Sequence, residues 1–263
     1  GLRRGGTIYR ALIVGCGRMG CGRDHESPWL YDHASAYNQL SERVDLVGFV
    51  DRVFSRAEWA AKKFGVQFAG DNLDAALTMI RPDVVSICTP PSDRAEIFAA
   101  CAQIPVKALW CEKPLGLREP PPMPCQVNYI RRFDVRHWAI AEQRARSLRP
   151  ADLFVIAAKD LHTVCHFTDL ARFWRIPKDR LHYSHFHGPS LYVLREAGDK
   201  PGRYAGWRDE AFVGGGVSDG FMQAALANLL DALDGKKGLV SSAESAIESE
   251  TWAAEILADH AVG

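Results

Sequence analysis

Up to about residue 115, the chain alternates between two hydrophobic patterns. Some runs are apolar throughout, which favours strands buried on both faces, and they occupy residues 7–15, 44–51, 82–91 and 106–114. Between them, apolar residues recur at helical spacing over residues 35–40, 55–65, 71–79 and 92–104. Strands and helices that alternate in this way predict an α/β domain, with a parallel, doubly wound sheet covered by helices on both faces.

The predicted elements carry residues suited to start or stop them. Gly65 closes the helix over residues 55–65, because a residue without a Cβ suits the left-handed C-cap. Asp71 or Asn72 is a suitable N-cap for the following helix. Pro90 and Pro91 stop the third strand, because proline cannot donate a hydrogen bond within a central ladder.

Beyond residue 116 the pattern changes. The proline-rich residues 117–125 cannot form a regular helix, so we predict one domain over residues 1–120 and a smaller α/β domain over residues 121–263. The second domain is predicted to hold helices at 136–148, 165–176, 220–235 and 242–260, and strands at 152–160 and 190–196. An alternative is that the last two helices pack back on the first domain.

Composition and charge narrow the class of protein. Hydrophobic residues make up 47% and charged residues 24% of the 263 residues, which is ordinary for a globular chain. Lys plus Arg equals Asp plus Glu, 32 against 32, so the basic excess of nucleic-acid or membrane binders is missing. We expect a small-molecule partner and a homo-oligomer, with no nucleic acid and no membrane.

Cysteine usage points to a reducing compartment. The seven cysteines form no C-x-x-C pair, and several lie inside apolar runs, so buried reduced thiols are the simplest interpretation. The basic first residues lead into a predicted strand without a typical signal-peptide cleavage site, and no stretch reaches the length of a membrane span. We therefore expect a cytoplasmic protein.

Three glycines, Gly15, Gly17 and Gly20, lie between the first predicted strand and a helix expected to open near Met19. In a dinucleotide-binding turn they would serve the tight turn, the approach of a pyrophosphate and helix–strand packing, with the phosphates at the helix N-terminus. Asp51 ends the next strand, farther along than the usual ~20 residues, and polar residues 21–35 account for the difference as an insertion. This context favours a dinucleotide site over a glycine bend in another α/β fold.

The choice between NAD and NADP depends on the residues after the second strand. Asp51 favours a free ribose 2′-hydroxyl, which a carboxylate can accept as a hydrogen-bond donor. Arg52 and Arg56 could instead hold a 2′-phosphate, or could be two solvated arginines at a helix start. The sequence favours NAD slightly.

Lys113 stands at the carboxyl end of a predicted strand, at the sheet edge where ligands of open α/β sheets bind. A lysine there can polarise or protonate a substrate oxygen, and burial can bring its pKa toward neutrality. The alternative is an ordinary Glu–Lys pair at the surface beyond the strand.

Six segments together resemble the Gfo/Idh/MocA oxidoreductases. They are "ALIVGCGRMG", "VGFVD", "PDVVSICTPP", "CEKPLG", "VNYIRRFD" and "HFTDLARFW", in that order. The resemblance implies an N-terminal Rossmann domain and a second α/β domain with an open, mostly antiparallel sheet. It also implies hydride transfer between NAD(P) and a carbinol or carbonyl carbon of a sugar, nucleotide sugar or cyclitol.

The resemblance implies roles for individual residues. Lys113 would be catalytic, with a cis Lys113–Pro114 bond that fixes it toward the nicotinamide, and Glu112 would lie near the ribose. The cofactor-binding residues would be Gly15, Gly17, Arg18, Met19, Gly20, Asp51, Arg52, Arg56, Thr89, Pro90, Pro91, Glu112 and Lys113.

In the second domain the family motif reads roughly Asp-x-Gly-x-His-x-x-Asp, and the matching stretch here is "HTVCHFTD", residues 162–169. His166 would act as acid or base beside Lys113, with Asp169 at the substrate; a satisfied structural histidine is the alternative. His162 occupies the acidic position and Val164 the glycine, which alters the proton-transfer arrangement. On a helix His162 and His166 would be one turn apart, but without a nearby acidic third ligand we expect no metal.

Two further segments hold polar residues of interest. Asn128, Tyr129, Arg131 and Arg132 follow the domain boundary near the expected substrate cleft, where an arginine could bind a phosphate or carboxylate; interdomain ion pairing is equally favoured. Residues 182–187, "HYSHFH", resemble a metal site by composition, but a structural role is favoured, with a substrate contact as the alternative.

The chain also departs from the family in length. The proline run replaces a helix before residues 127–134, and the second domain is short, as in a compact member or one whose loops are missing from this sequence. The expected activity is that of an NAD(P)-dependent dehydrogenase or reductase acting on CH–OH groups. The rival function is a cofactor-binding sensor without turnover, favoured by the altered motif and opposed by Lys113.

Overall fold

The computed structural model describes residues 7–23, 32–134, 153–157, 160–184, 190–196, 204–212 and 220–260. These residues divide into two compact units. The first takes in residues 1–133 and 219–244, and the second residues 134–218 and 245–263. The first unit thus extends past the expected boundary at residue 120, because a further strand joins the same sheet beyond the proline-rich run.

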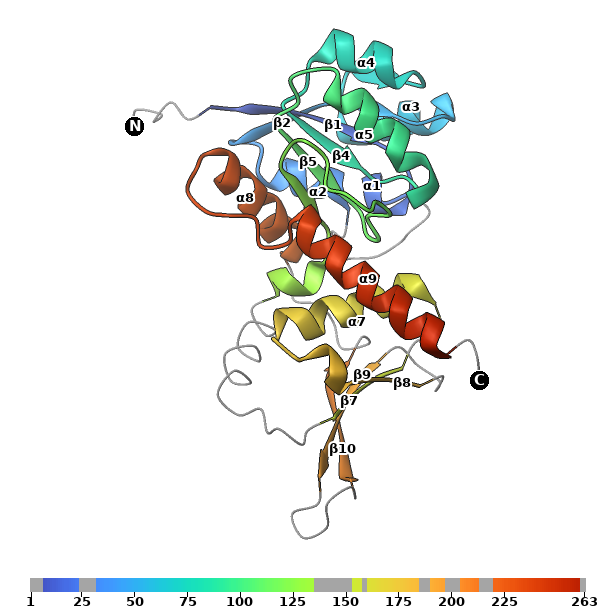
Figure 1. Cartoon of the computed structure of the whole chain (residues 1–263). Coiled ribbons are helices and arrows are strands. Elements are labelled where there is room, and N and C mark those ends of the chain that lie inside the picture. Colours follow the sequence, from blue (N-terminus) through green and yellow to red (C-terminus); the bar gives the residue numbers. More distant parts are fainter. Residues whose placement is uncertain are drawn as a thin grey trace, which may run out of the picture. The chain divides into compact units, whose positions relative to one another are not determined.

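The first unit is built on a six-stranded sheet (Figure 1). Its strands are β1 (Tyr9–Val14), β2 (Val44–Val50), β3 (Phe68–Gly70), β4 (Val84–Ile87), β5 (Ala108–Cys111) and β6 (Cys125–Val127). The order is β3-β2-β1-β4-β5-β6 and every neighbouring pair is parallel. All four predicted strands are present, and β4 and β5 are buried along their whole length.

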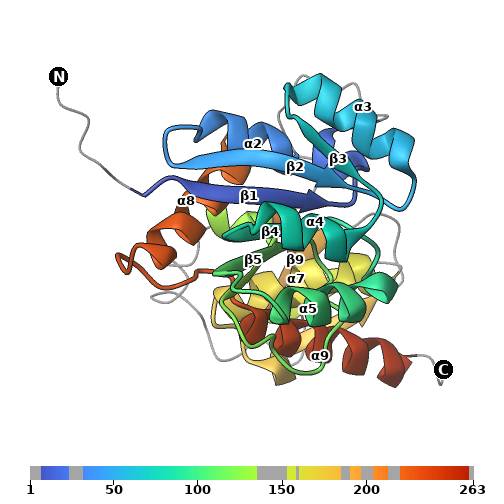
Figure 2. The same cartoon turned by 90° about the horizontal axis from the view of Figure 1, so that it is seen from above.

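Helices cover the sheet on both faces. They are α1 (Arg18–Cys21), α2 (His33–Gln39), α3 (Phe54–Phe64), α4 (Leu73–Ile80), α5 (Arg94–Ala102) and α8 (Phe221–Leu233). Figure 2 shows α2 and α3 on one side of β1 and β2, and α4 and α5 on the other. The predicted caps are present: Gly65 is left-handed at φ 68°, and the Asn72 side chain accepts a hydrogen bond from the backbone N–H of Ala75 at 2.9 Å.

The helix that was expected to open near Met19 is present but short. It is the single turn α1, and it ends because Gly22 adopts the left-handed conformation at φ 64°. The next described helix is α2, whose N-cap Asp32 accepts from the backbone N–H of Ser35 at 2.8 Å. A helix of one turn has little macrodipole, so phosphate binding here would rest on individual amides.

Helix α8 belongs to the first unit although it lies about a hundred residues downstream of that unit's sheet. It packs against α2, β5 and the short 3-10 turn η2 (Ile130–Phe133). The Gln126 side chain on β6 donates to the carbonyl of Ala225 at 2.6 Å, and the Tyr9 hydroxyl donates to Asp234 at 2.8 Å. Hydrogen bonds from β6 and β1 therefore attach α8 and its C-cap to the sheet.

The second unit contains a four-stranded mixed sheet. Its strands are β7 (Leu153–Ala157), β8 (Leu181–Ser184), β9 (Ser190–Glu196) and β10 (Tyr204–Phe212), in the order β10-β9-β7-β8. The β7–β8 pair is parallel, whereas β9 pairs antiparallel with β7 and with β10. The other described elements are the helices α7 (Leu161–Phe173) and α9 (Ala243–His260) and the 3-10 helix η3 (Lys178–Arg180). The predicted helix over residues 136–148 lies outside the described residues.

The two helices of the second unit are joined by polar contacts. Thr168 on α7 donates to the carbonyl of Ser249 on α9 at 2.7 Å, and Arg172 pairs with Glu248.

All seven cysteines are free thiols. Within the described part of the chain, no helix is both long enough and apolar enough to cross a bilayer.

Candidate cofactor and catalytic site

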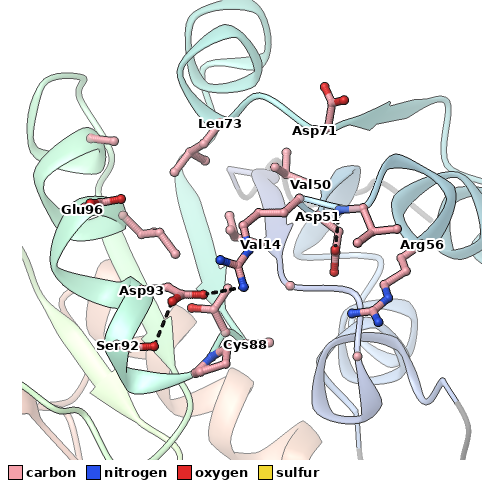
Figure 3. Close-up of a pocket in the computed structure, with 18 of the residues that line it drawn as sticks. Val14, Val50, Asp51, Arg56, Asp71, Leu73, Cys88, Ser92, Asp93 and Glu96 are labelled. Atoms are coloured by element: carbon pink, nitrogen blue, oxygen red, sulfur yellow. Dashed lines mark hydrogen bonds and ion pairs between the residues drawn. The ribbon is translucent and has the colours of Figure 1, made fainter.

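A cavity of about 630 Å³ opens at the carboxyl ends of β1, β2 and β4 (Figure 3). Val14 and Val50 end the first two of these strands, and Cys88 follows the third. The chain turns from β1 toward β2 on one side, and β4 lies on the other, so the cavity occupies the switch point of the sheet. This is the position at which open α/β sheets bind their ligands.

The three glycines of the turn each have a different physical reason to lack a side chain. Gly15 has φ +97°, and a Cβ there would lie 2.8 Å from the carbonyl carbon of Cys88. A Cβ on Gly20 would lie 2.0 Å from the carbonyl oxygen of Gly15. Gly17 lines the cavity and a Cβ on it would meet nothing within 4 Å. Protein packing explains two of the glycines, and Gly17 leaves space that a ligand can approach.

Asp51 connects the end of β2 to the glycine turn. One carboxylate oxygen accepts the backbone N–H of Cys16 at 2.8 Å, and the other accepts that of Val53 at 2.9 Å. The carboxylate is half-buried and borders the cavity. Each oxygen has a second lone pair, so the group can accept further hydrogen bonds from a ligand hydroxyl.

The cavity wall is mainly acidic. Its charged side chains are Asp51, Asp71, Asp74, Asp93 and Glu96 against Arg52 and Arg56. Arg52 pairs with Asp93 at 3.2 Å, so its charge is partly compensated. Figure 3 shows Asp93 and Glu96 across the cavity from Asp51 and Arg56. This balance of charge suits a ligand with hydroxyl donors better than one with an additional phosphate.

Seven of the predicted cofactor residues line the cavity: Gly15, Gly17, Asp51, Arg52, Arg56, Thr89 and Pro90. The remaining ones, Arg18, Met19, Gly20, Pro91, Glu112 and Lys113, do not line it. Gly20 packs against the backbone of Gly15 in the turn and therefore does not face the cavity. Glu112 is buried and hydrogen-bonded to the side chains of His33 and Asn128, and its place near the ribose stays a prediction.

Lys113 follows β5 and is half-buried, and its bond to Pro114 is cis, as the family resemblance implies. The backbone around it is held by Arg94, which is 2% exposed and begins α5. The Arg94 guanidinium donates to the carbonyls of Glu112 and Pro114, on either side of the lysine. It also donates to the carbonyl of Thr89 at 2.7 Å. One buried cation therefore joins the turn after β4 to the turn after β5.

The Glu112 carboxylate is held by two side chains from other elements. His33 Nε2 lies 3.0 Å from Oε1, and the Asn128 amide donates to the same oxygen at 2.5 Å. Burial by itself raises the pKa of Glu112, but the hydrogen bond and charge interaction with His33, the hydrogen bond from Asn128 and the charge of Lys113 outweigh it, and the pKa is lowered. Glu112 is therefore an ionised carboxylate inside the first unit.

The residues predicted to bind substrate after the domain boundary are buried. Asn128 and Tyr129 are each 1% exposed, and Arg131 and Arg132 are also buried. Asn128 contacts Glu112 and Met222, and Arg132 donates to the carbonyl of Val240 at 2.8 Å. These contacts give Asn128 and Arg132 internal partners, and binding of substrate by the four residues stays a prediction.

The residues of the second-domain motif all fall on α7, as the helical spacing predicts. His166 is half-buried, and the backbone of His162 lies one turn before it. Asp169 is 1% exposed and accepts a hydrogen bond from the Ser249 hydroxyl at 3.0 Å, so it helps to pack α7 on α9. Lys113 belongs to the first unit and His166 to the second, and their pairing stays a prediction.

No group of three or more His, Cys, Asp or Glu side chains that could hold a metal occurs among the described residues. His182 lies on β8, and the remaining histidines of "HYSHFH" fall outside the described residues.

Sequence reasoning did not find His33 and Arg94. A signal for His33 was present: His33 and Tyr37 are polar residues spaced i, i+4 on one face of a short helix, and both are buried. Arg94 is one of many arginines in the chain, and no local pattern marks it as buried.

The strand order, the glycine turn and the acidic residue at the end of β2 define a dinucleotide-binding Rossmann domain. Residues 9–121 match the model of the GFO_IDH_MocA family, described as an oxidoreductase family with an NAD-binding Rossmann fold. Residues 9–121 thus match the NAD-binding Rossmann domain of the Gfo/Idh/MocA oxidoreductases, as the motifs predict.

Solved structures extend the likeness over most of the chain. An Agrobacterium radiobacter oxidoreductase in complex with NAD+, L-tartaric acid and magnesium is 13% identical, with a TM-score of 0.67 and 97% of each chain covered. The Bordetella pertussis WlbA dehydrogenase, in complex with NADH and UDP-GlcNAcA, is 13% identical, with a TM-score of 0.64 and 92% of this chain and 93% of that one covered. A myo-inositol dehydrogenase from Corynebacterium glutamicum is 14% identical, with a TM-score of 0.62 and 96% of each covered.

At these identities the likeness concerns the fold alone. The comparison with curated proteins found no match.

Proposed function

We propose that the protein is an NAD-dependent oxidoreductase acting on a carbinol or carbonyl carbon of a sugar, nucleotide sugar or cyclitol. The observation that carries the proposal is the space at Gly17, which lines the cavity at the switch point and has nothing within 4 Å of its Cβ position. The family model describes an NAD-binding oxidoreductase, and the similar structures include enzymes of inositol and nucleotide-sugar chemistry.

NAD is preferred over NADP in this proposal. Asp51 is oriented by two backbone amides and can accept from a ribose hydroxyl. A 2′-phosphate in the same place would meet this carboxylate at short range, with further acids on the cavity wall. Arg52 is paired with Asp93, which lowers its value as a phosphate ligand.

Lys113 is the proposed proton donor and acceptor. The nicotinamide, when bound, supplies or accepts a hydride at the substrate carbon. During reduction the Lys113 ammonium binds the carbonyl oxygen and transfers one proton to it, which yields the alcohol and a neutral amine. During oxidation the amine takes the same proton back. Arg94 and the Lys113–Pro114 turn fix the backbone from which this side chain extends.

The second unit contributes His166 in this proposal, as an acid or base assisting Lys113, with His162 tuning it. Asp169 supports α7 through Ser249. Self-association through the second sheet is also proposed, by analogy with the family only.

The test is a fluorescence titration of the protein with NADH and NADPH, followed by a panel of keto-sugars, nucleotide sugars and cyclitols. Lys113→Ala should lower turnover by about 10²–10⁴-fold while the Kd for NADH stays within about threefold. Lys107→Ala is the matched control, because this exposed lysine precedes β5 and pairs with Asp83. Equal losses of turnover and cofactor affinity in Lys113→Ala would reduce Lys113 to a cofactor ligand.

A sensor without turnover is the second candidate. The observation that favours it is the motif on α7, where Val164 at the glycine position is fully buried and Asp169 is occupied by Ser249. Tight NADH binding with no turnover across the panel would select the sensor. Absence of binding of either cofactor would contradict both functions.

A further inference from the structure

Arg94 is a buried cation whose hydrogen bonds lie at the edge of the sheet where the cavity opens. It begins α5 and is 2% exposed. Its Nε and Nη2 both donate to the carbonyl of Thr89, at 3.1 and 2.7 Å. Its Nη1 donates to the carbonyls of Glu112 and Pro114. All three nitrogens of the guanidinium are therefore used, and together they span two turns of the chain.

The partners of Arg94 are unusual for a buried charge. Within the described part of the chain, no carboxylate forms an ion pair with it, and its hydrogen bonds go to main-chain carbonyls. Taking a charge out of water costs free energy, and an apolar side chain of similar size often fills such a place at least as well. General stability is therefore a poor explanation for an arginine here. An apolar side chain could not, however, bind two turns at once.

The two turns that Arg94 joins differ in their relation to the cavity. In the turn after β4 (residues 88–91), Thr89 lines the cavity, and its hydroxyl oxygen is buried without a hydrogen-bond partner in the described residues. Such an atom is available to a ligand. The turn after β5 (residues 112–116) is not part of the cavity wall, and it carries Lys113 between the two carbonyls that Arg94 binds. Arg94 thus connects the cavity wall to the backbone of the lysine.

A second contact joins the same two turns. Gly116 has φ +74°, and a Cβ there would lie 2.9 Å from the Cβ of Pro91, so the turns pack without room for a side chain. At the start of the turn after β5, the backbone N–H of Glu112 donates to the carbonyl of Ile87 at 2.9 Å. This turn contains no helix or strand of its own. Its path is therefore set against the turn after β4, by contacts at both ends and by Arg94 between them.

We infer that Arg94 is a positioning residue for Lys113, which fixes the backbone of the lysine to the cavity wall at Thr89. The inference rests on the proposed function for its catalytic meaning, because Lys113 is the proposed proton donor. The link between the two turns belongs to the first unit alone and can be measured without substrate or cofactor. A displacement of about 1 Å in a reacting group can lower a rate by about 10²-fold, so this link is a means of setting turnover.

Hydrogen exchange in the ligand-free, full-length protein tests the link. Amide exchange is read by mass spectrometry in peptides that cover residues 88–93 and 112–118. In Arg94→Lys the charge remains, but a single ammonium cannot span the three carbonyls, so both peptides should exchange at least about tenfold faster. Arg94→Met, which keeps a stem of similar length and removes the charge, should do the same. Peptides from β2 should stay within about twofold of the wild-type rate.

Two further variants are matched to these. Gly116→Ala separates the two turns at their packing contact without changing Arg94, and it should also speed exchange over residues 112–118. Arg10→Lys makes the same chemical change at a guanidinium that donates to the carbonyl of Ile80 at 3.0 Å. Arg10 lies near the start of β1, at the opposite edge of the sheet from the cavity. This variant should leave both peptides at the wild-type rate.

Turnover measures the catalytic meaning of the link. With any substrate found in the panel, Arg94→Lys should lower kcat by about tenfold or more, while the Kd for NADH stays within about threefold. It should still bind one NADH per chain. A residue needed only for folding would instead lower the number of NADH molecules bound per chain together with the rate.

The inference is overturned if residues 112–118 in Arg94→Lys exchange at the wild-type rate, or if exchange rises equally over the whole first unit. Failure of both Arg94 variants to fold would also overturn it, since folding itself would then require the arginine. If only Arg94→Met fails to fold, Arg94→Lys decides. Faster exchange with an unchanged kcat would contradict the positioning role. If the wild type turns over no substrate, the proposed function fails, and the exchange rates still decide whether Arg94 fixes the backbone of Lys113.

Discussion

Two carboxylates stand at strand ends in the first unit, and they are held in opposite ways. Asp51, after β2, is half-buried and accepts from two backbone amides. Glu112, after β5, is buried and accepts from the side chains of His33 and Asn128. Backbone donors survive any substitution that preserves the path of the chain, whereas side-chain donors exist only with those particular residues. The position of the Asp51 carboxylate is therefore specified by the local backbone turn. The position of the Glu112 carboxylate, next to Lys113 in the sequence, is specified by tertiary side-chain contacts.

The largest expected effect is on stability when the buried carboxylate is removed. Glu112→Ala leaves the His33 and Asn128 donors without an acceptor in the interior, and should lower the free energy of unfolding by about 3 kcal/mol. Asp51→Ala exposes two amides at the cavity, where water can replace the carboxylate, and should cost about 1 kcal/mol. Urea unfolding of both variants measures the difference. An equal or larger loss of unfolding free energy in Asp51→Ala would contradict the conclusion that the buried Glu112 contacts matter more for stability than the Asp51 contacts.

The glycine turn offers the next largest effect. Gly20→Ala places a Cβ against the carbonyl of Gly15, and we expect a loss of about 2 kcal/mol in the free energy of unfolding together with weaker NADH binding. Gly17→Ala meets no protein atom, so stability should change by less than about 0.5 kcal/mol. Its Kd for NADH should nevertheless rise by about tenfold or more, since the added methyl occupies the proposed ligand space. Unchanged NADH affinity in Gly17→Ala would contradict the proposed cofactor position.

Lowering the pH should remove the stabilisation that the ionised Glu112 carboxylate contributes to the folded protein. Burial opposes the shift, but hydrogen bonds from His33 and Asn128 leave the pKa of Glu112 lowered from its ordinary 4.5 in the folded protein. The unfolded chain therefore binds this proton more tightly, so the stabilisation is complete above pH 4.5 and is lost as the pH falls through the folded value. In urea titrations from about pH 7 to pH 3, the stability difference between wild type and Glu112→Gln should be constant above pH 5 and shrink below it.

The preference for NADH over NADPH tests the proposed role of Asp51 as a ligand of the ribose. Asp51→Ala should weaken NADH binding by about tenfold and NADPH binding less, so that the ratio of the two Kd values narrows. Asp71→Ala is the control, because Asp71 lines the same cavity but is exposed and accepts no hydrogen bond from the glycine turn. A ratio that narrows equally in both variants would assign selectivity to the general negative charge of the cavity.

The smallest effect is expected at the cavity rim. Arg52 is 82% exposed in its ion pair with Asp93, and such pairs contribute at most about 1 kcal/mol. Arg52→Ala should therefore shift the midpoint of thermal unfolding by no more than a few degrees, measured by circular dichroism. A larger shift would mean that the pair holds the two sides of the cavity together.

The two carboxylates also show what a sequence can reveal. Asp51 was predictable because its motif, glycine turn plus acid at the end of the next strand, is local to one β-α-β unit. The contact between His33 and Glu112 spans 79 residues and joins elements whose packing no local pattern encodes. Strand β3, three half-buried residues, was missed because it has no apolar run of its own. The helix near Met19 was predicted, but its end after one turn was not, because Gly22 was not recognised as a stop signal.

The position of α8 has a consequence for how the protein is made. The β6 region relies on partners that are synthesised late: Gln126 on Ala225, Arg132 on Val240, and the backbone N–H of Val127 on the carbonyl of Ser241. A nascent chain that has emerged only as far as residue 133 lacks all of them. At about 5–20 residues per second on the ribosome, the nucleotide-binding half must wait several seconds before it can close. Its sheet can begin to form early, but the domain that starts first is completed almost last.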